Sequence, residues 1–246
     1  MTEHLRVHII PVGYDSTRIT EPLIDRKADK VYFIRHESDK WYSRYFNFVK
    51  KELKNKKELE TTEEFIDMWD LFKCIKKFKE IAKKEKNNHI YINVSTGSKI
   101  TSIAGMFTSM LIENVEPYYV HIEYPSQTKK EKIVKDKVRK TDDLPVFEIN
   151  KPPTEHLVVL QMLSNGNKMK KKELIDELIA KKIIQKKDQN TPFFTDYAKH
   201  SQLRTILEPM ENIWEFIKID GKGKKSRVQI TSQGSFALKI FGNDID

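Results

Sequence analysis

The residues best suited to chemistry lie in one stretch, Asn93 to Thr101, which reads Asn-Val-Ser-Thr-Gly-Ser-Lys-Ile-Thr. The apolar residues 90–94 predict a buried β-strand, and residues 100–107 are apolar at helical spacing. A helix that begins directly after a tight polar turn presents unpaired backbone N–H groups and the positive end of its dipole. Hydroxyl groups and a lysine ammonium add donors, so the turn is suited to a phosphate or a ribose. The candidate ligand-binding residues of this turn are Ser95, Thr96, Gly97, Ser98 and Lys99.

This stretch differs from the two common glycine-rich phosphate motifs. A P-loop needs a glycine five residues before Gly97, where this chain has Ile92, and the dinucleotide pattern G-x-G-x-x-G is absent. The alternative interpretation is an ordinary strand-to-helix turn whose serine and threonine side chains only cap the helix. Local chemistry by itself leaves both interpretations open.

A second polar loop follows the first predicted strand, residues 5–11, and contributes the candidate ligand-binding residues Gly13, Ser16, Thr17 and Arg18. In a doubly wound parallel sheet, ligands bind where the loops of two central strands open at the carboxyl edge. If the strands at 5–11 and 89–94 are neighbours, Arg18 and Lys99 converge on one phosphodiester. The alternative is that Arg18 is an ordinary cation on a helix surface.

In this order, the two motifs resemble those of CARF domains, the CRISPR-associated Rossmann-fold sensors. Their turn is commonly an Asn or Ser, a Thr-Gly pair, a small residue and a Lys, and their first loop carries a Gly and then a polar-Arg step. The resemblance covers residues 1–124. It implies a homodimer that binds a cyclic oligoadenylate, with cyclic tetra-adenylate favoured and no cofactor required. Ser98 stands where many members have a second Gly or a Thr, which leaves the ring size open.

Composition limits the class of protein. The chain has 246 residues, 38% of them hydrophobic, and a single cysteine, Cys74, which cannot form an internal disulfide. No run of 18 apolar residues predicts a membrane-spanning helix, and the N-terminus lacks an apolar signal core. The seven histidines are scattered without an H-E-x-x-H motif, so no metal site and no catalytic residue is assigned. These features predict a cytoplasmic protein with no membrane partner.

The chain divides into three parts. Residues 1–124 alternate strand and helix, which predicts a Rossmann-like α/β domain: a parallel sheet with helices on both faces. Within it, a long helix is expected from Thr62, with Phe65 and Trp69 facing inward. Residues 125–150 are expected to be a charged connector, and residues 151–246 a winged helix-turn-helix domain.

The C-terminal part predicts three helices, a β-hairpin and a terminal helix, the order of a winged helix. Most of the net charge of +9 lies in residues 125–246, as expected for a polyanion partner such as double-stranded DNA. The third helix, residues 195–207, would enter the major groove, with Tyr197 facing inward, and the hairpin tip would touch phosphates. The candidate DNA-binding residues are Lys199, His200, Gln202, Arg204, Lys222, Lys224, Lys225 and Arg227. The alternative is a winged helix that contacts only proteins.

The parts together predict a homodimer that senses a cyclic nucleotide second messenger and binds DNA. This combination resembles archaeal CRISPR-linked transcriptional regulators with a CARF domain and a winged helix. One alternative is enzymatic: some CARF domains are metal-independent ring nucleases that cleave their own cyclic oligoadenylate. The R-x4–6-H motif of CARF-fused ribonucleases is absent. A further alternative is a regulator that senses another nucleotide.

Overall fold

The structure, a computed structural model, describes residues 4–38, 43–54, 59–123, 137–166, 168–185, 195–221, 223 and 226–242. The chain forms two compact units, residues 1–150 and 151–246, and each is described by itself. None of the helices in these ranges is long and apolar enough to cross a membrane.

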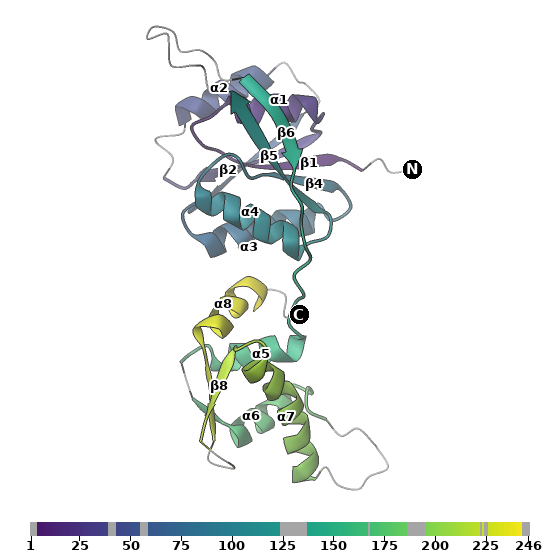
Figure 1. The fold of residues 1–246 in the computed structure, drawn as a ribbon, viewed down its shortest axis with the longest axis vertical. Helices are drawn as coiled ribbons and strands as arrows, with labels where there is room; N and C mark the ends of the chain where they lie inside the picture. The colour runs from purple at the N-terminus through teal and green to yellow at the C-terminus, as the bar shows by residue number, and fades with distance from the viewer. Residues whose placement is uncertain are drawn as a thin grey trace. The chain divides into compact units, whose positions relative to one another are not determined.

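The first unit is built on a six-stranded sheet with the order β3-β2-β1-β4-β5-β6 (Figure 1). The strands β1 to β5 run parallel, and β6 is antiparallel to β5. The central strands β1 and β4 are neighbours. Their apolar residues are buried on both faces of the sheet, as is typical of central parallel strands. The bounds are β1 Arg6–Pro11, β2 Lys30–His36, β3 Glu60–Ile66, β4 His89–Asn93, β5 Val115–Glu123 and β6 Lys137–Asp143.

Helices cover both faces of this sheet, as the alternating pattern predicts. On one face α3 (Leu71–Lys84) and α4 (Lys99–Leu111) pack against a core that includes Phe78 and Ile92. On the other face α1 (Thr17–Asp25) and α2 (Ser43–Leu53) enclose a second apolar cluster. Figure 1 shows α3 and α4 side by side beneath the sheet. The predicted α/β fold class is therefore confirmed.

The prediction of a long helix that begins at Thr62 is wrong. Residues 60–66 form β3, whose backbone is hydrogen-bonded in parallel to β2, and the helix begins only at Leu71. Asp70 caps it by accepting hydrogen bonds from the N–H groups of Phe72 and Lys73. Phe65 and Trp69, expected to face inward, are 53% and 62% exposed. Strand pairing with a distant segment overrides the local helical spacing.

Part of the expected connector of residues 125–150 is a strand of the first unit. Residues 137–143 form β6, which pairs with the otherwise open edge of β5. Beyond β6, the Leu144 N–H donates to the Pro117 carbonyl (2.9 Å) and the Ile149 N–H to the Met110 carbonyl (2.8 Å). The chain from 137 to 149 therefore belongs to the first unit; residues 124–136 lie outside the described ranges.

A histidine is buried in the middle of β1. His8 has no exposed surface, and its Nδ1 lies 3.3 Å from the Tyr118 hydroxyl. Burial, and then the nearby cations of Arg26 and Arg6, lower the pKa of His8 to about 3. His8 is therefore neutral in the folded protein at pH values where it binds a proton in the unfolded chain.

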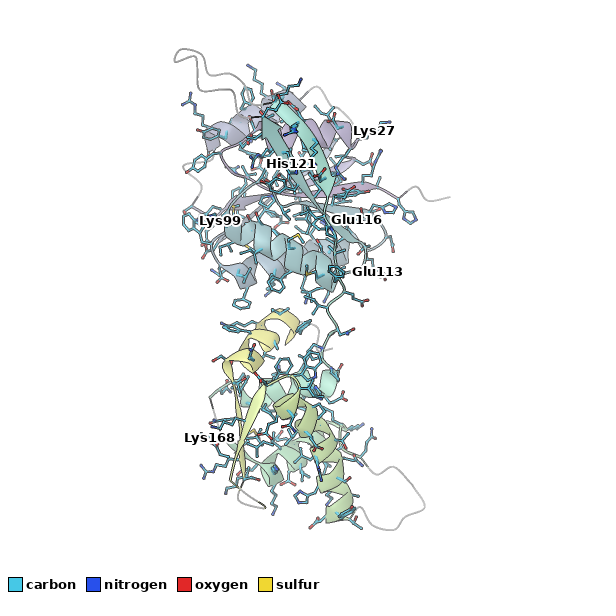
Figure 2. The ribbon with its side chains drawn as sticks, in the orientation of Figure 1. Lys27, Lys99, Glu113, Glu116, His121 and Lys168 are labelled. Atoms are coloured by element: carbon cyan, nitrogen blue, oxygen red, sulfur yellow. The ribbon has the colours of Figure 1, made fainter. Side chains whose placement is uncertain are left out.

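We expect His8 to make the first unit sensitive to acid. Above pH 6.5 the residue is neutral in both states; between pH 6.5 and about 3 only the unfolded chain takes up the proton, so stability falls as pH falls. The slope should reach about 1.4 kcal/mol per pH unit. Urea denaturation across this window should show a shallower loss in His8→Gln than in the wild type. The control is His121→Gln, at a half-exposed histidine (Figure 2), and equal slopes in all three proteins would contradict the prediction.

The second unit has the predicted winged-helix architecture. A small antiparallel sheet with the order β7-β9-β8 packs with the helices α5, α6, α7 and α8. On α7, the buried residues Leu203, Leu207 and Met210 recur every three or four positions and face the core. The bounds are α5 Thr154–Leu163, β7 Met169–Lys170, α6 Lys171–Ala180, α7 Asp196–Asn212, β8 Ile217–Asp220, β9 Arg227–Ile230 and α8 Ser232–Phe241.

Candidate functional site

The turn after β4 is a built helix cap. The Ser98 Oγ accepts a hydrogen bond from the Thr101 N–H (3.2 Å), and the Thr101 Oγ1 accepts one from the Ser98 N–H (2.8 Å). The Ser98 hydroxyl also donates to the Met68 carbonyl at 3.1 Å. This is a capping box, so the capping interpretation holds for Ser98. The hydroxyl of Ser98 is engaged by the fold.

The backbones of the two candidate loops touch each other at two glycines. A Cβ atom at Gly13 would lie 2.9 Å from the backbone nitrogen of Gly97. Gly97 has φ +76°, and a Cβ there would lie 2.6 Å from the Pro11 Cβ and 2.6 Å from the Thr101 Oγ1. Both positions require glycine, because close backbone approach and a left-handed conformation each exclude a side chain. The loops after β1 and β4 thus meet at the carboxyl edge of the sheet.

Asn93, the last residue of β4, is hydrogen-bonded to both loops. It is completely buried, and its Nδ2 donates to the Arg18 carbonyl at 2.8 Å. Its Oδ1 accepts hydrogen bonds from the Ser95 N–H (3.0 Å) and the Ser95 hydroxyl (2.6 Å). Asn93 is not among the predicted ligand-binding residues; a buried amide at the end of a central strand is the signal that marks it.

Arg18 is a bridge between the loops, and its side chain is only 16% exposed. Its Nη1 donates to the Ser95 carbonyl at 3.1 Å, and its Nε lies 3.1 Å from the Asp15 carboxylate. Arg18 is therefore largely buried between the two loops and does not lie on an open helix surface. The guanidinium positions Ser95, and Asp15 compensates part of its charge.

Lys99 is the exposed cation of the site. It is the first residue of α4 and lies at the surface, where the helix N-terminus favours an anion (Figure 2). Two residues before the cap, Thr96 is 5% exposed, and its Oγ1 has no hydrogen-bond partner within the described part of the chain. In the first loop, Thr17 is buried and Ser16 makes no side-chain cap on α1. Among these residues, Lys99 at the start of α4 is therefore the candidate exposed donor for a ligand.

The exposed face of α7 carries the candidate DNA-binding residues. His200 and Arg204 are exposed, and the Arg204 guanidinium forms an ion pair with Glu208 at 3.2 Å. Tyr197, expected to face inward, is 85% exposed because it lies in the first turn of the helix, beyond the core. Lys199 lies 3.6 Å from the Asp196 carboxylate.

The Gln202 side chain makes hydrogen bonds within the second unit. Its Oε1 accepts a hydrogen bond from the Gln185 N–H (3.2 Å), and its Nε2 donates to the Gln185 carbonyl (2.9 Å). Both ends of the amide are therefore committed to the backbone after α6. On the hairpin, Arg227 is exposed at the start of β9, whereas Lys222, Lys224 and Lys225 lie outside the described residues.

A cleft of about 490 Å³ separates α7 from the β8–β9 hairpin. Its lining includes two carboxylates from the C-terminal half of α7, Glu208 and Glu211. Glu211 accepts a hydrogen bond from the Ile219 N–H at 2.8 Å and so fixes the hairpin. The lining also includes the cationic side chains of Lys171 and Arg204, so the cleft carries groups of both charges.

No group of three or more His, Cys, Asp or Glu side chains within the described ranges is placed to hold a metal ion. The acidic residues nearest the ligand turn already have partners: Asp15 pairs with Arg18, and Asp67 lies 3.5 Å from the Lys73 ammonium.

Two family models match the chain, one on each unit. Residues 6–124 match the model described as HFX_2341_N:-like, N-terminal. Residues 155–242 match the DUF6293 C-terminal winged helix domain. A protein of Methanocaldococcus jannaschii, described as uncharacterized, is 32% identical over 191 residues. That alignment covers 66% of this chain and 57% of the relative, so the chain spans little more than half of the relative's length.

Among solved structures, the chain is similar to Csm6 of Enterococcus italicus bound to cyclic hexa-2'-fluoro-hexa-dAMP, with TM-score 0.45, 10% identity and coverage of 85% and 56% of the two chains. It is also similar to Can2 of Sulfobacillus thermosulfidooxidans in complex with cyclic tetra-adenylate, with TM-score 0.42, 11% identity and coverage of 96% and 64%. A third is the protein VC1899 of Vibrio cholerae, with TM-score 0.38, 13% identity and coverage of 92% and 75%. These scores lie below 0.5, and the ligands are those of the proteins named.

Proposed function

From a chain that joins a CARF-like Rossmann domain to a winged helix domain of the DUF6293 type, we propose a DNA-binding transcriptional regulator that responds to a cyclic oligoadenylate. The regulator acts as a homodimer in CRISPR-linked defence, and its ligand binds around the turn at residues 95–99. Cyclic tetra-adenylate is the favoured ligand. The second unit binds double-stranded DNA through α7 and the hairpin that follows it.

The observation that carries this proposal is the contact between Gly13 and Gly97 beneath an exposed lysine. Two loops from neighbouring strands meet so closely that neither Gly13 nor Gly97 can carry a side chain, and α4 begins with Lys99, two residues after Gly97. This arrangement supplies backbone donors and one positive charge to a phosphate without any metal. A ligand with rotational symmetry is matched by two copies of such a site around a two-fold axis.

The short segment between Ile149 and Thr154 favours coupling between ligand binding and DNA binding. Since the Ile149 N–H is bonded to the Met110 carbonyl on α4, the chain is held by the first unit almost up to α5, which begins at Thr154. The helix that receives the ligand at its N-terminus thus holds the connector near its C-terminus. Pro152 and Pro153 stiffen the short remaining segment. A typical coupling free energy of 1–3 kcal/mol corresponds to about 5- to 150-fold in affinity, and it is reciprocal.

The test is a binding screen of the full chain over cyclic tri-, tetra- and hexa-adenylate, followed by DNA selection with and without the bound ring. The proposal expects one ring to bind and to change DNA affinity by the same factor by which DNA changes ring affinity. Equal DNA affinity in both conditions would refute the coupling. Analysis of the products after the protein is incubated with the cyclic oligoadenylate tests the enzymatic alternative. Rapid conversion to linear products would show a ring nuclease.

Lys99→Ala should weaken ring binding about 10- to 100-fold, because a hydrogen bond to a charged group contributes about 1.5–3 kcal/mol. The matched control is Lys86→Ala, an exposed lysine before the amino end of β4. Calorimetry should show the loss only in the first variant, with DNA affinity in the absence of the ring retained by both. Unchanged ring affinity in Lys99→Ala would remove this residue from the site.

Replacing the two arginines among the candidate DNA-binding residues, Arg204 and Arg227, should affect DNA binding differently. Arg227→Ala removes a cation of the hairpin, so it should weaken binding to all sequences alike and lower the log–log salt slope by about 0.9. Arg204→Ala should relax sequence preference, since α7 is the helix expected to read base edges. Fluorescence anisotropy at several salt concentrations measures both effects. A wild-type slope in Arg227→Ala would show that this end of the hairpin does not contact the DNA backbone.

A further inference from the structure

An exposed tryptophan stands beside the ligand turn. Trp69 is 62% exposed, and its ring lies over the ring of His36 with centroids 4.1 Å apart and an interplanar angle of 43°. His36 itself is only 6% exposed. One face of the indole is thus supported by the protein, while most of the side chain faces solvent.

The segment that carries Trp69 is fixed to the ligand turn. Met68, the preceding residue, is 3% exposed, and its carbonyl accepts the hydrogen bond from Ser98 at the start of α4. The Met68 Cε lies within 3.2 Å of a Cβ built at Gly97. On the other side, the Trp69 N–H donates to the Asp67 Oδ1 at 3.1 Å. The backbone that carries the indole is therefore fixed one residue from a direct hydrogen bond to the turn that would bind a phosphate.

His36 is held in place as the support of the indole. Its Nδ1 accepts the Ser38 N–H at 3.1 Å and lies 2.8 Å from the Ser38 hydroxyl. This pattern places the ring proton on Nε2, which lies 3.5 Å from the Asp67 carboxylate. The same carboxylate receives the Trp69 N–H, and the contacts with Ser38 orient the histidine that supports the indole.

We propose that Trp69, supported by His36, is the stacking face for a purine base of the nucleotide whose phosphate binds at Lys99. This inference rests on the proposed function and names the residue that distinguishes the base. A flat, rigid ring beside an anion site is what base stacking requires, and a larger base covers more of it. The neighbouring exposed ring, Phe65, lies below the Arg35 guanidinium at 5.1 Å and so already has a cation on it.

The test compares cyclic tetra-adenylate with cyclic tetra-uridylate on the full-length chain. Trp69→Ala should weaken the adenylate ring about 5- to 150-fold and should reduce the preference for adenylate over uridylate. Trp69→Phe should retain most of the affinity, because it keeps an aromatic face. The fluorescence quench that the adenylate ring produces in the wild type should be lost in Trp69→Phe, although the chain's other tryptophans remain.

Phe65→Ala is the matched control, an exposed aromatic residue of β3 that should bind both rings like the wild type. Thermal unfolding checks that Trp69→Ala is folded. If the wild type binds the adenylate ring and Trp69→Ala binds it equally well, the stacking proposal is overturned while the proposed function stands. If the wild type binds no adenylate ring, the proposed function fails and the stacking proposal fails with it.

Discussion

Replacing Gly97 with alanine should destabilise the first unit by about 2–5 kcal/mol and abolish ring binding. The left-handed conformation costs an L-residue roughly 1–2 kcal/mol, and forcing a methyl group into packed atoms costs about 1–3 kcal/mol more. The new Cβ would meet the Pro11 Cβ and the Thr101 Oγ1, both at 2.6 Å. Relief of that clash requires the capping box at Ser98 to open or the first loop to move away, and either change disrupts the ligand turn.

Gly166 supplies a matched control for this substitution. Its φ of +75° is almost the same as that of Gly97, but a Cβ there meets nothing within 4 Å. Gly166→Ala should therefore cost only the conformational strain of roughly 1–2 kcal/mol. Urea denaturation of the two variants separates strain from clash. Equal costs at the two positions would contradict the crowding of Gly97 by Pro11 and Thr101.

The second large effect is expected at Glu85, on the amino side of the same sheet. Its side chain is 7% exposed and lies 3.1 Å from the Lys30 ammonium. The Tyr32 hydroxyl donates to it at 2.5 Å, and the Asn88 amide donates at 2.8 Å. Burial raises the pKa of Glu85, but the hydrogen bonds from Tyr32, Lys30 and Asn88 outweigh it, and the pKa lies below its ordinary value. Glu85 is therefore ionised at neutral pH and fully engaged.

Glu85→Ala should destabilise the protein by about 3–5 kcal/mol, because it removes the buried one of the two carboxylates beside the Lys30 ammonium and takes the acceptor away from the buried Tyr32 hydroxyl. The control is Glu60→Ala, since Glu60 contacts the same Lys30 at 2.8 Å but is 60% exposed. An exposed ion pair contributes only about 0–1 kcal/mol. Chemical denaturation should separate the two variants by at least 2 kcal/mol, and similar costs would contradict the buried cluster.

The fold class and most elements of both units could be predicted from the sequence. Continuous apolar runs mark the strands β1 and β4, because both faces of a central parallel strand are buried. The short polar turn at 95–98 marks the start of α4, and the order of helices and hairpin marks the winged helix. These signals are local: each depends on residues adjacent in the chain. Local periodicity failed at residues 62–70, where the partner strand β2 takes the backbone hydrogen bonds.

The contacts that candidate side chains make within the fold could not be predicted from the sequence. The sequence nominated Arg18 and Gln202 as binding groups, but Arg18 bonds to the Ser95 carbonyl and Gln202 to the Gln185 backbone. It placed Trp69 in the core, yet the indole lies exposed on His36. The physical reason is the same in each case. A hydrogen bond or ring contact between residues distant in the chain leaves no periodic trace in either segment, so these contacts become visible only when the sheet brings the loops together.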